Sequence, residues 1–318
     1  MNIGLLGMGN IGTGTYKTLE MNRAGIEART GLDLRITRIL EIDTERDRGV
    51  SVSKDSFTQD PDSIFSDPEI SIVIELLGGV EPATSFMLAA MNGGKSVVTA
   101  NKAAVAANYE ALTEAAAKNG VQFRFEASVG GGIPILTALT GALLANEYTE
   151  IMGILNGTTN YILTKMTQEG RAYEEALAEA QAKGFAEADP TADVEGTDVA
   201  NKLAILLSLA FGKRVRPEEI PTKGISQITK EDIEEARSQG CVIKLIASAF
   251  YADGKLKYFI SPTYMHETHP LAGVSNEFNA VFVKGNAVGE LMFYGKGAGP
   301  LPTGSAVMGD VIEIARSL

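Results

Sequence analysis

The sequence predicts an α/β protein of two domains, the first built on a parallel sheet that helices cover on both faces. The chain has 318 residues, and a single hydrophobic core stops growing at about 250–300 residues, so two domains are expected. Short apolar runs alternate with helical patterns through residues 1–128. Because these runs are apolar throughout, they are typical of parallel strands buried on both faces.

The composition excludes several classes of protein. Hydrophobic residues make up 45% of the chain and the net charge is -12, which argues against a nucleic-acid partner. A single cysteine, Cys241, and two histidines exclude an intrachain disulfide and argue against a zinc site. No signal peptide is expected, and the apolar stretches fall short of the ~20 residues that span a bilayer. We therefore expect a soluble, cytoplasmic protein without a membrane partner.

A glycine motif follows the first strand directly. Residues 2–6 are apolar, residues 7–12 read GMGNIG, and a helical pattern starts near Ile11. In such a GxGxxG turn the glycines make the turn, let the backbone approach a pyrophosphate and let the helix pack closely on the strand. The motif predicts a Rossmann-type dinucleotide-binding domain whose cofactor contacts are Gly7, Gly9, Asn10, Ile11 and Gly12.

The remaining elements of the first domain follow in alternation. Pro82 suits the first turn of a helix, and the segment around residues 108–118 is rich in alanine. We expect strands at 34–40, 72–77, 96–99 and 121–125, with helices after Pro82 and at 108–118.

The end of the second strand bears on the choice of coenzyme. It reads Glu41-Ile42-Asp43, and an acidic residue there binds ribose hydroxyls and so favours NAD, whereas a basic residue admits the 2′-phosphate of NADP. Arg46 and Arg48 lie close by and could serve a phosphate. NAD and NADP both stay open, with NAD favoured. Lys102 follows the fourth strand, at the edge where ligands of such sheets bind.

An acidic segment, residues 184–202, precedes an apolar helical run. Pro190 and Gly196 interrupt any continuous helix through it. Asp198 and Lys202 are four residues apart and share one face of a helix. This arrangement suits a small cationic ligand. Solvated surface charge is the ordinary alternative.

Later segments predict a second domain of α+β type with a mostly β sheet. Strands are expected at 151–155, 258–264, 279–284 and 291–294. Between the two domains, residues 126–134 read EASVGGGIP, a glycine loop whose backbone can approach a ligand.

Taken together, six segments resemble the homoserine dehydrogenase family: GMGNIG, TANK (99–102), FEASVGGGIPI (125–135), NGTTNYIL (156–163), KGFAEADPTADVEGTDVANKLAIL (183–206) and GKGAGPLPTGSAVMGDV (295–311). They run in order over nearly the whole chain. The resemblance implies hydride transfer between L-aspartate 4-semialdehyde and L-homoserine with NAD or NADP, in threonine, methionine and isoleucine biosynthesis.

The resemblance also implies roles for single residues. Lys202 matches the proton donor, Asp198 the aspartate beside the reacting centre, and Lys102 a lysine at the nicotinamide end that shares the acid role. Glu187 and Asp193 are expected to hold the substrate ammonium. The implied substrate-binding set is Glu187, Asp193, Asp198, Gly157, Thr158 and Thr159, and Gly184 and Gly299 join the cofactor contacts.

The glycine loop matches a metal site for a monovalent cation, sodium or potassium, with Glu126 and the carbonyls of Val129, Gly131 and Ile133 as ligands. In the family the second domain pairs two subunits, so a homodimer is expected. We expect the catalytic and dimerisation domain at 129–303 and a helix at 304–318 that rejoins the first domain. The chain is expected to be the monofunctional, short form without a C-terminal regulatory domain.

Two other functions compete with this hypothesis. One is another amino-acid or semialdehyde dehydrogenase of the same architecture. The other is a catalytically silent nucleotide-sensing protein, which needs the glycine loop but no proton donor. The sequence carries Lys202, Asp198 and Glu187, and these residues favour an enzyme.

Overall fold

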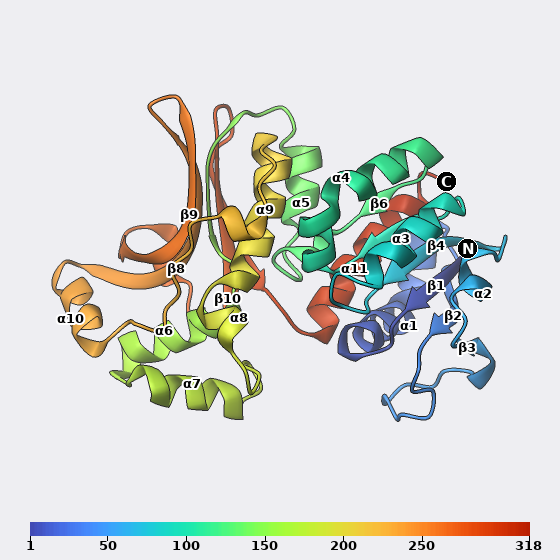
Figure 1. The fold of residues 1–318 in the computed structure, drawn as a ribbon, viewed down its shortest axis with the longest axis horizontal. Coiled ribbons are helices and arrows are strands. Elements are labelled where there is room, and N and C mark those ends of the chain that lie inside the picture. The colour runs from blue at the N-terminus through green and yellow to red at the C-terminus, as the bar shows by residue number, and fades with distance from the viewer. The chain divides into compact units, whose positions relative to one another are not determined.

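The computed structural model describes residues 1–318 and divides into two compact units (Figure 1). Unit 1 comprises Met1–Gly132 and Ala298–Leu318, and unit 2 comprises Ile133–Gly297. None of the helices combines the length and the apolar composition needed to cross a bilayer.

Unit 1 contains the predicted parallel sheet. Its strand order is β3-β2-β1-β4-β5-β6, and all neighbours run parallel. This is the order of a doubly wound dinucleotide-binding sheet, in which the strand order reverses between β1 and β4. The strands are β1 (Asn2–Leu6), β2 (Arg35–Leu40), β3 (Phe57–Thr58), β4 (Ile70–Glu75), β5 (Ser96–Thr99) and β6 (Phe123–Arg124).

Helices cover both faces of this sheet, and each face has its own apolar core. On one face lie α1 (Asn10–Thr30) and α11 (Pro300–Ala315), which meet the sheet through side chains such as Leu19 and Val311. On the other lie α2 (Asp62–Phe65), α3 (Ala83–Asn92) and α4 (Lys102–Asn119). Two short 3-10 turns, η1 (Lys54–Ser56) and η2 (Glu126–Ser128), complete unit 1.

Three predicted boundaries in unit 1 are wrong. Helix α4 begins at Lys102 and not near residue 108, because the Asn101 side chain accepts a hydrogen bond from the Ala104 amide and caps the helix. The C-terminal helix begins at Pro300 and not at Gly304, since proline is tolerated in a first turn. Strand β4 ends at Glu75, so the two leucines that follow lie outside the sheet.

Unit 2 is built on an antiparallel sheet, which confirms the predicted mostly β second domain. Its order is β11-β10-β7-β8-β9. The strands are β7 (Tyr148–Ile154), β8 (Cys241–Ala252), β9 (Lys255–His266), β10 (Phe278–Gly285) and β11 (Gly289–Lys296). Strand β8 was not predicted; it pairs with β7 and β9 along an apolar run.

The other elements of unit 2 are helical. They are α5 (Ile135–Thr137), the π-helical η3 (Ala138–Ala142), α6 (Gly157–Glu169), α7 (Tyr173–Ala182), α8 (Thr191–Val194), α9 (Thr197–Phe211), η4 (Pro217–Glu219), α10 (Lys230–Ser238) and η5 (Pro270–Gly273). Proline and glycine divide the acidic segment as predicted, since α8 starts after Pro190 and Gly196 separates it from α9.

A buried lysine in this unit predicts a pH-dependent stability. Lys244 on β8 is 4% exposed and donates to the Asn160 side-chain oxygen and the Val274 carbonyl. Burial lowers its pKa from 10.5 to about 8. From about pH 8 to pH 10.5 the unfolded chain therefore keeps a proton that the folded chain has lost, so the free energy of unfolding gains up to about 1.4 kcal/mol per pH unit from this group.

Urea unfolding of Lys244→Met from pH 7.5 to pH 10 should lack this gain. The exposed Lys257→Met on the neighbouring strand β9 is the matched control and should keep the wild-type slope. Equal slopes for the two variants would show that Lys244 stays charged throughout.

Candidate active site

The centre of the candidate site in unit 2 is a buried lysine–aspartate pair on α9. Lys202 Nζ lies 2.7 Å from Asp198 Oδ2, and both residues are 8% exposed. The lysine also donates to the Leu155 carbonyl, at the end of β7, over 2.7 Å. The shared helical face predicted from the four-residue spacing is confirmed. The geometry holds the ammonium in one orientation and leaves it little contact with water.

Asn156 joins this pair to a second carboxylate. Its side-chain nitrogen donates to Asp198 Oδ2 over 2.9 Å and to Asp193 Oδ1 over 2.7 Å. Its side-chain oxygen accepts from the Thr159 amide and so caps α6. One side chain thus fixes the start of a helix and the spacing of two aspartates. The contacts of Asn156 with the two aspartates were not predicted.

Asp193 belongs to the same group through Thr158. The Thr158 hydroxyl can donate its one proton to Asp193 Oδ2, 3.1 Å away, or to the Phe185 carbonyl, 2.7 Å away. Burial raises the pKa of Asp193, and the nearby Asp198 charge raises it further. We call these five residues, Asn156, Thr158, Asp193, Asp198 and Lys202, the lysine–carboxylate cluster. With both aspartates ionised it carries one net negative charge, which suits a cationic ligand.

Several predicted substrate and cofactor residues lie outside this cluster. Glu187 is exposed, and only its backbone carbonyl has a described partner, the Gln181 side chain. Gly157 packs closely against the backbone at Glu277: a β-carbon on Gly157 would lie 2.7 Å from the Glu277 carbonyl oxygen. The Thr159 hydroxyl donates back to Asn156, so both residues shape the start of α6. Gly184 lies in an exposed turn at φ +76.

In unit 1 the three motif glycines have different roles. Gly7 has φ +90, a conformation that favours glycine. A β-carbon on Gly12 would lie 2.1 Å from the Gly7 carbonyl, so α1 packs directly on the turn. A β-carbon on Gly9 would meet nothing within 4 Å, which leaves open space above the turn. Such a space is where a pyrophosphate approaches the backbone.

A pocket of about 360 Å³ opens beside this turn. We call it the glycine pocket. Of the predicted cofactor residues, Gly9 and Asn10 line it, whereas Gly7 in the turn and Ile11 and Gly12 in the first turn of α1 do not. Gly299 precedes α11, whose first residue, Pro300, also lines the pocket. The lining residues are Met8, Gly9, Asn10, Thr13, Gly14, Lys17, Arg46, Asp47, Arg48, Pro300 and Leu301.

A second group of polar residues lies at the carboxyl ends of β4 and β5, the edge at which such sheets bind ligands. Glu75, which the sequence analysis did not single out, is fully buried, and burial raises its pKa. It accepts from the Thr99 hydroxyl and the Leu77 amide, each over 2.7 Å. Lys102 begins α4 directly after the capping Asn101, which also donates to the Gly79 carbonyl.

A buried acidic pair is formed by Glu126, in the loop after β6, and Asp310 on α11. Glu126 is 5% exposed, and its backbone amide donates to Asp310 Oδ2 over 2.8 Å. Burial raises the pKa of Asp310 to about 7, with a further contribution from the Glu126 charge. Gly130 and Gly131 follow with φ angles of +74° and +57°, which turn the loop sharply.

The doubly wound parallel sheet, the open glycine turn and a buried lysine held by a carboxylate define an NAD(P)-dependent oxidoreductase. Comparison with known proteins gives the family. A model of the homoserine dehydrogenase NAD-binding domain matches residues 7–126, and a model of homoserine dehydrogenase itself matches residues 134–312. The chain belongs to the homoserine dehydrogenase family.

Relatives and solved structures agree with this assignment. The chain is 44% identical over 318 residues to homoserine dehydrogenase of Bacillus subtilis, and the match covers 100% of this chain and 73% of the relative. A crystal structure of a homoserine dehydrogenase from Thiobacillus denitrificans has a TM-score of 0.94 at 43% identity, and covers 99% of this chain and 73% of that one. A hyperthermophilic archaeal homoserine dehydrogenase in complex with NADPH has a TM-score of 0.83 at 25% identity, and covers 100% and 98%.

Proposed function

We propose that Lys202 is the proton donor and acceptor of this homoserine dehydrogenase, which interconverts L-aspartate 4-semialdehyde and L-homoserine. The observation that carries this role is the buried Lys202 ammonium, held between Asp198 and the Leu155 carbonyl. When bound, NAD(P) supplies or takes up the hydride. In the reducing direction Lys202 gives a proton to the substrate oxygen as it becomes an alkoxide.

The remaining members of the cluster bind the substrate. Its ammonium group suits the net negative charge of Asp193, Asp198 and Lys202, because a buried cation needs an anionic partner. Asn156 holds the two carboxylates in place through its side-chain nitrogen. Thr158, with the neighbouring Gly157 and Thr159, forms the turn that we assign to the substrate carboxylate. Glu187 lies on an exposed turn, and we propose that it reaches the ammonium only when substrate is bound.

The residues of unit 1 fit the coenzyme. The open space over Gly9 admits a pyrophosphate, and the start of α1 offers free amides and the positive end of the helix dipole. We propose that Gly7, Gly9, Asn10, Ile11 and Gly12 bind the dinucleotide with Gly184 and Gly299, and that Lys102 contacts the nicotinamide end and shares the acid role. NADPH in the archaeal relative supports a nicotinamide coenzyme.

Homoserine oxidation should become faster from neutral to alkaline pH. In this direction Lys202 must accept a proton, so only its neutral form is productive. The measurement is initial rates with homoserine and NAD or NADP from pH 7 to pH 10, in wild type and Lys202→Ala. A flat profile for the wild type would contradict the assignment. Turnover of other hydroxy amino acids but not of homoserine would contradict the substrate.

We propose a monovalent cation at the loop of Glu126, with the carbonyls of Val129, Gly131 and Ile133 as further ligands. The buried pair of acidic residues, Glu126 and Asp310, supports a cation there because two carboxylates in one apolar site repel each other. The cation orders the loop and does no chemistry.

Removing the carboxylate of Glu126 should remove the response to the cation. We expect wild-type activity to rise on adding sodium or potassium chloride and that of Glu126→Ala to stay level. Choline chloride at equal ionic strength is the control. A response that is the same in both proteins would exclude the site.

The assembly is proposed to be a homodimer formed through the sheet of unit 2. Four large side chains are exposed on this sheet: Tyr251 on β8, Tyr264 on β9, and Met292 and Tyr294 on β11. Met292 and Tyr294 are two residues apart on the edge strand β11 and so share one face, and exposed apolar side chains along a sheet edge favour an interface. We further place the reaction in threonine, methionine and isoleucine biosynthesis. One free cysteine, Cys241, suits the cytoplasm.

A further inference from the structure

We propose that Lys17, together with Arg46, binds the adenosine 2′-phosphate of NADP. The enzyme then accepts NADP although Glu41 stands at the end of β2. This inference rests on the proposed coenzyme site and extends it to residues that follow the glycine motif.

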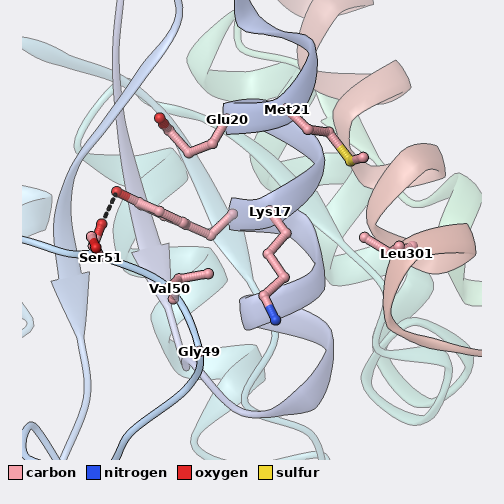
Figure 2. A pocket seen from close by; sticks show the side chains of 8 residues that line it. Lys17, Glu20, Met21, Gly49, Val50, Ser51 and Leu301 are labelled. Atoms are coloured by element: carbon pink, nitrogen blue, oxygen red, sulfur yellow. Dashed lines mark hydrogen bonds between the residues drawn. The ribbon is translucent and has the colours of Figure 1, made fainter.

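Lys17 lies on the face of α1 that looks into the glycine pocket. Asn10, Thr13, Gly14 and Lys17 are spaced by three or four residues and line that pocket together. Lys17 also lines a neighbouring pocket of about 440 Å³, shown in Figure 2, and so stands on the wall that the two pockets share. Its side chain runs along α1 between Gly49 and Leu301, away from Glu20 and Met21 (Figure 2).

The ammonium of Lys17 lies against the loop that follows β2. A β-carbon built on Gly49 would be 3.6 Å from Lys17 Nζ. The ammonium forms no ion pair or hydrogen bond, and the two acidic residues that line these pockets have other partners. Glu20 pairs with Arg23, and Asp47 accepts from the Gly49 amide over 2.8 Å. An anion in the pocket would therefore meet a cation that has no competing partner.

The two residues that sequence alone favours for coenzyme selection are already engaged. Arg48 donates to the carbonyls of Met8, Arg46 and Asp43, and its side chain is only 6% exposed. Glu41 accepts from the amides of Met8, Ile42 and Asp43, and lies 3.4 Å from Arg48.

These contacts change the expected selectivity. The positive charge of Arg48 offsets the negative charge of the Glu41 carboxylate. Both oxygens of Glu41 accept hydrogen bonds that hold the loop to the glycine turn. Glu41 is thus poorly placed to reject a phosphate by its charge, and Arg48 already donates to three backbone carbonyls. The side chain of Arg46 is exposed, lines the same pocket and makes no hydrogen bond. Lys17 and Arg46 are the two cations left to bind a phosphate.

The chemistry of a phosphate monoester fits this pair. It carries close to two negative charges at neutral pH and offers several acceptor oxygens. A lysine supplies a point charge with three donors and an arginine a planar fork. The ribose hydroxyl of NAD has no charge, so Lys17 contributes little to NAD binding.

Two soluble probes isolate the 2′-phosphate without any turnover. Calorimetric binding of 2′,5′-ADP and of 5′-ADP would be compared in wild type, Lys17→Gln and Lys17→Arg. Because the substitution removes a charge-assisted hydrogen bond, we expect Lys17→Gln to bind 2′,5′-ADP at least about tenfold more weakly. Its affinity for 5′-ADP should change less than about twofold, and Lys17→Arg should keep most of the affinity.

Kinetics and a matched control complete the test. KM should rise for NADPH and not for NADH in Lys17→Gln, whereas Lys118→Gln, which removes a charge at the far end of α4, should change neither. Equal weakening of both probes would place Lys17 on the pyrophosphate and overturn the proposal, as would unchanged binding of 2′,5′-ADP. Because probe binding needs no homoserine, a failure of the proposed reaction would leave this result readable.

Discussion

Lys202→Met should lower kcat for homoserine oxidation by about a hundredfold or more, the usual contribution of a positioned acid or base. The variant keeps most of the side-chain volume and removes the transferable proton. Asp198 then loses its ion-pair partner while remaining 8% exposed. Binding of NADH, measured by fluorescence, should be unchanged, because the role proposed for Lys202 is towards the substrate.

Lys202→Arg separates proton transfer from charge. Arginine keeps the positive charge beside Asp198 but stays protonated at all accessible pH values. If Lys202 acts as the acid and base, Lys202→Arg should be nearly as inactive as Lys202→Met, although it folds with an ion pair. If the lysine only supplies charge, the arginine variant should recover most of the rate. Thermal unfolding of both variants checks that lost activity does not reflect lost structure.

The part of the site that depends on spacing along one element could be predicted from the sequence. Asp198 and Lys202 meet because they are four residues apart on a helix, and the glycine turn follows from three residues next to a strand. The alternation of apolar runs and helical patterns was enough to predict the parallel sheet. The start of α4 differs from the prediction because the Asn101 side chain caps the helix at Lys102.

The part of the site that depends on contacts between distant segments could not be predicted from the sequence. Asn156 reaches Asp193 and Asp198 only because the end of β7 lies beside the start of α9, a proximity that no local pattern encodes. Its place between a strand and a helix is typical of a helix cap and does not indicate the contacts with the two aspartates. Glu75 stands in an apolar run and reads as a strand residue, yet its carboxylate is buried among donors. Glu187 was assigned by resemblance, and the structure leaves it exposed.

Gly12→Ala should lower the stability of the protein, whereas Gly9→Ala should weaken coenzyme binding, although the two glycines are only three positions apart in one motif. At Gly12 the new β-carbon would lie 2.1 Å from the Gly7 carbonyl, a backbone atom that can move only with the strand. Overpacking of this kind costs about 1–3 kcal/mol, so the melting temperature of Gly12→Ala should fall by several degrees.

At Gly9 the backbone has φ -71 and a β-carbon meets nothing within 4 Å. Alanine should thus leave the melting temperature of the free protein within about 1 °C of wild type, because the added methyl clashes with nothing. The added methyl occupies the space over which a pyrophosphate must approach the backbone. Affinity for NADH and NADPH should both fall by about tenfold or more, the effect of an interaction worth about 1.4 kcal/mol.

Calorimetric melting and coenzyme titration of both variants test the pair. A Gly9→Ala protein that binds coenzyme as tightly as wild type would show that the open space over this glycine is not where the phosphates lie. A Gly12→Ala protein with an unchanged melting temperature would show that α1 can move away from the turn at no cost. Because coenzyme stabilises whatever state binds it, saturating NADPH should raise the melting temperature of Gly12→Ala more than that of Gly9→Ala.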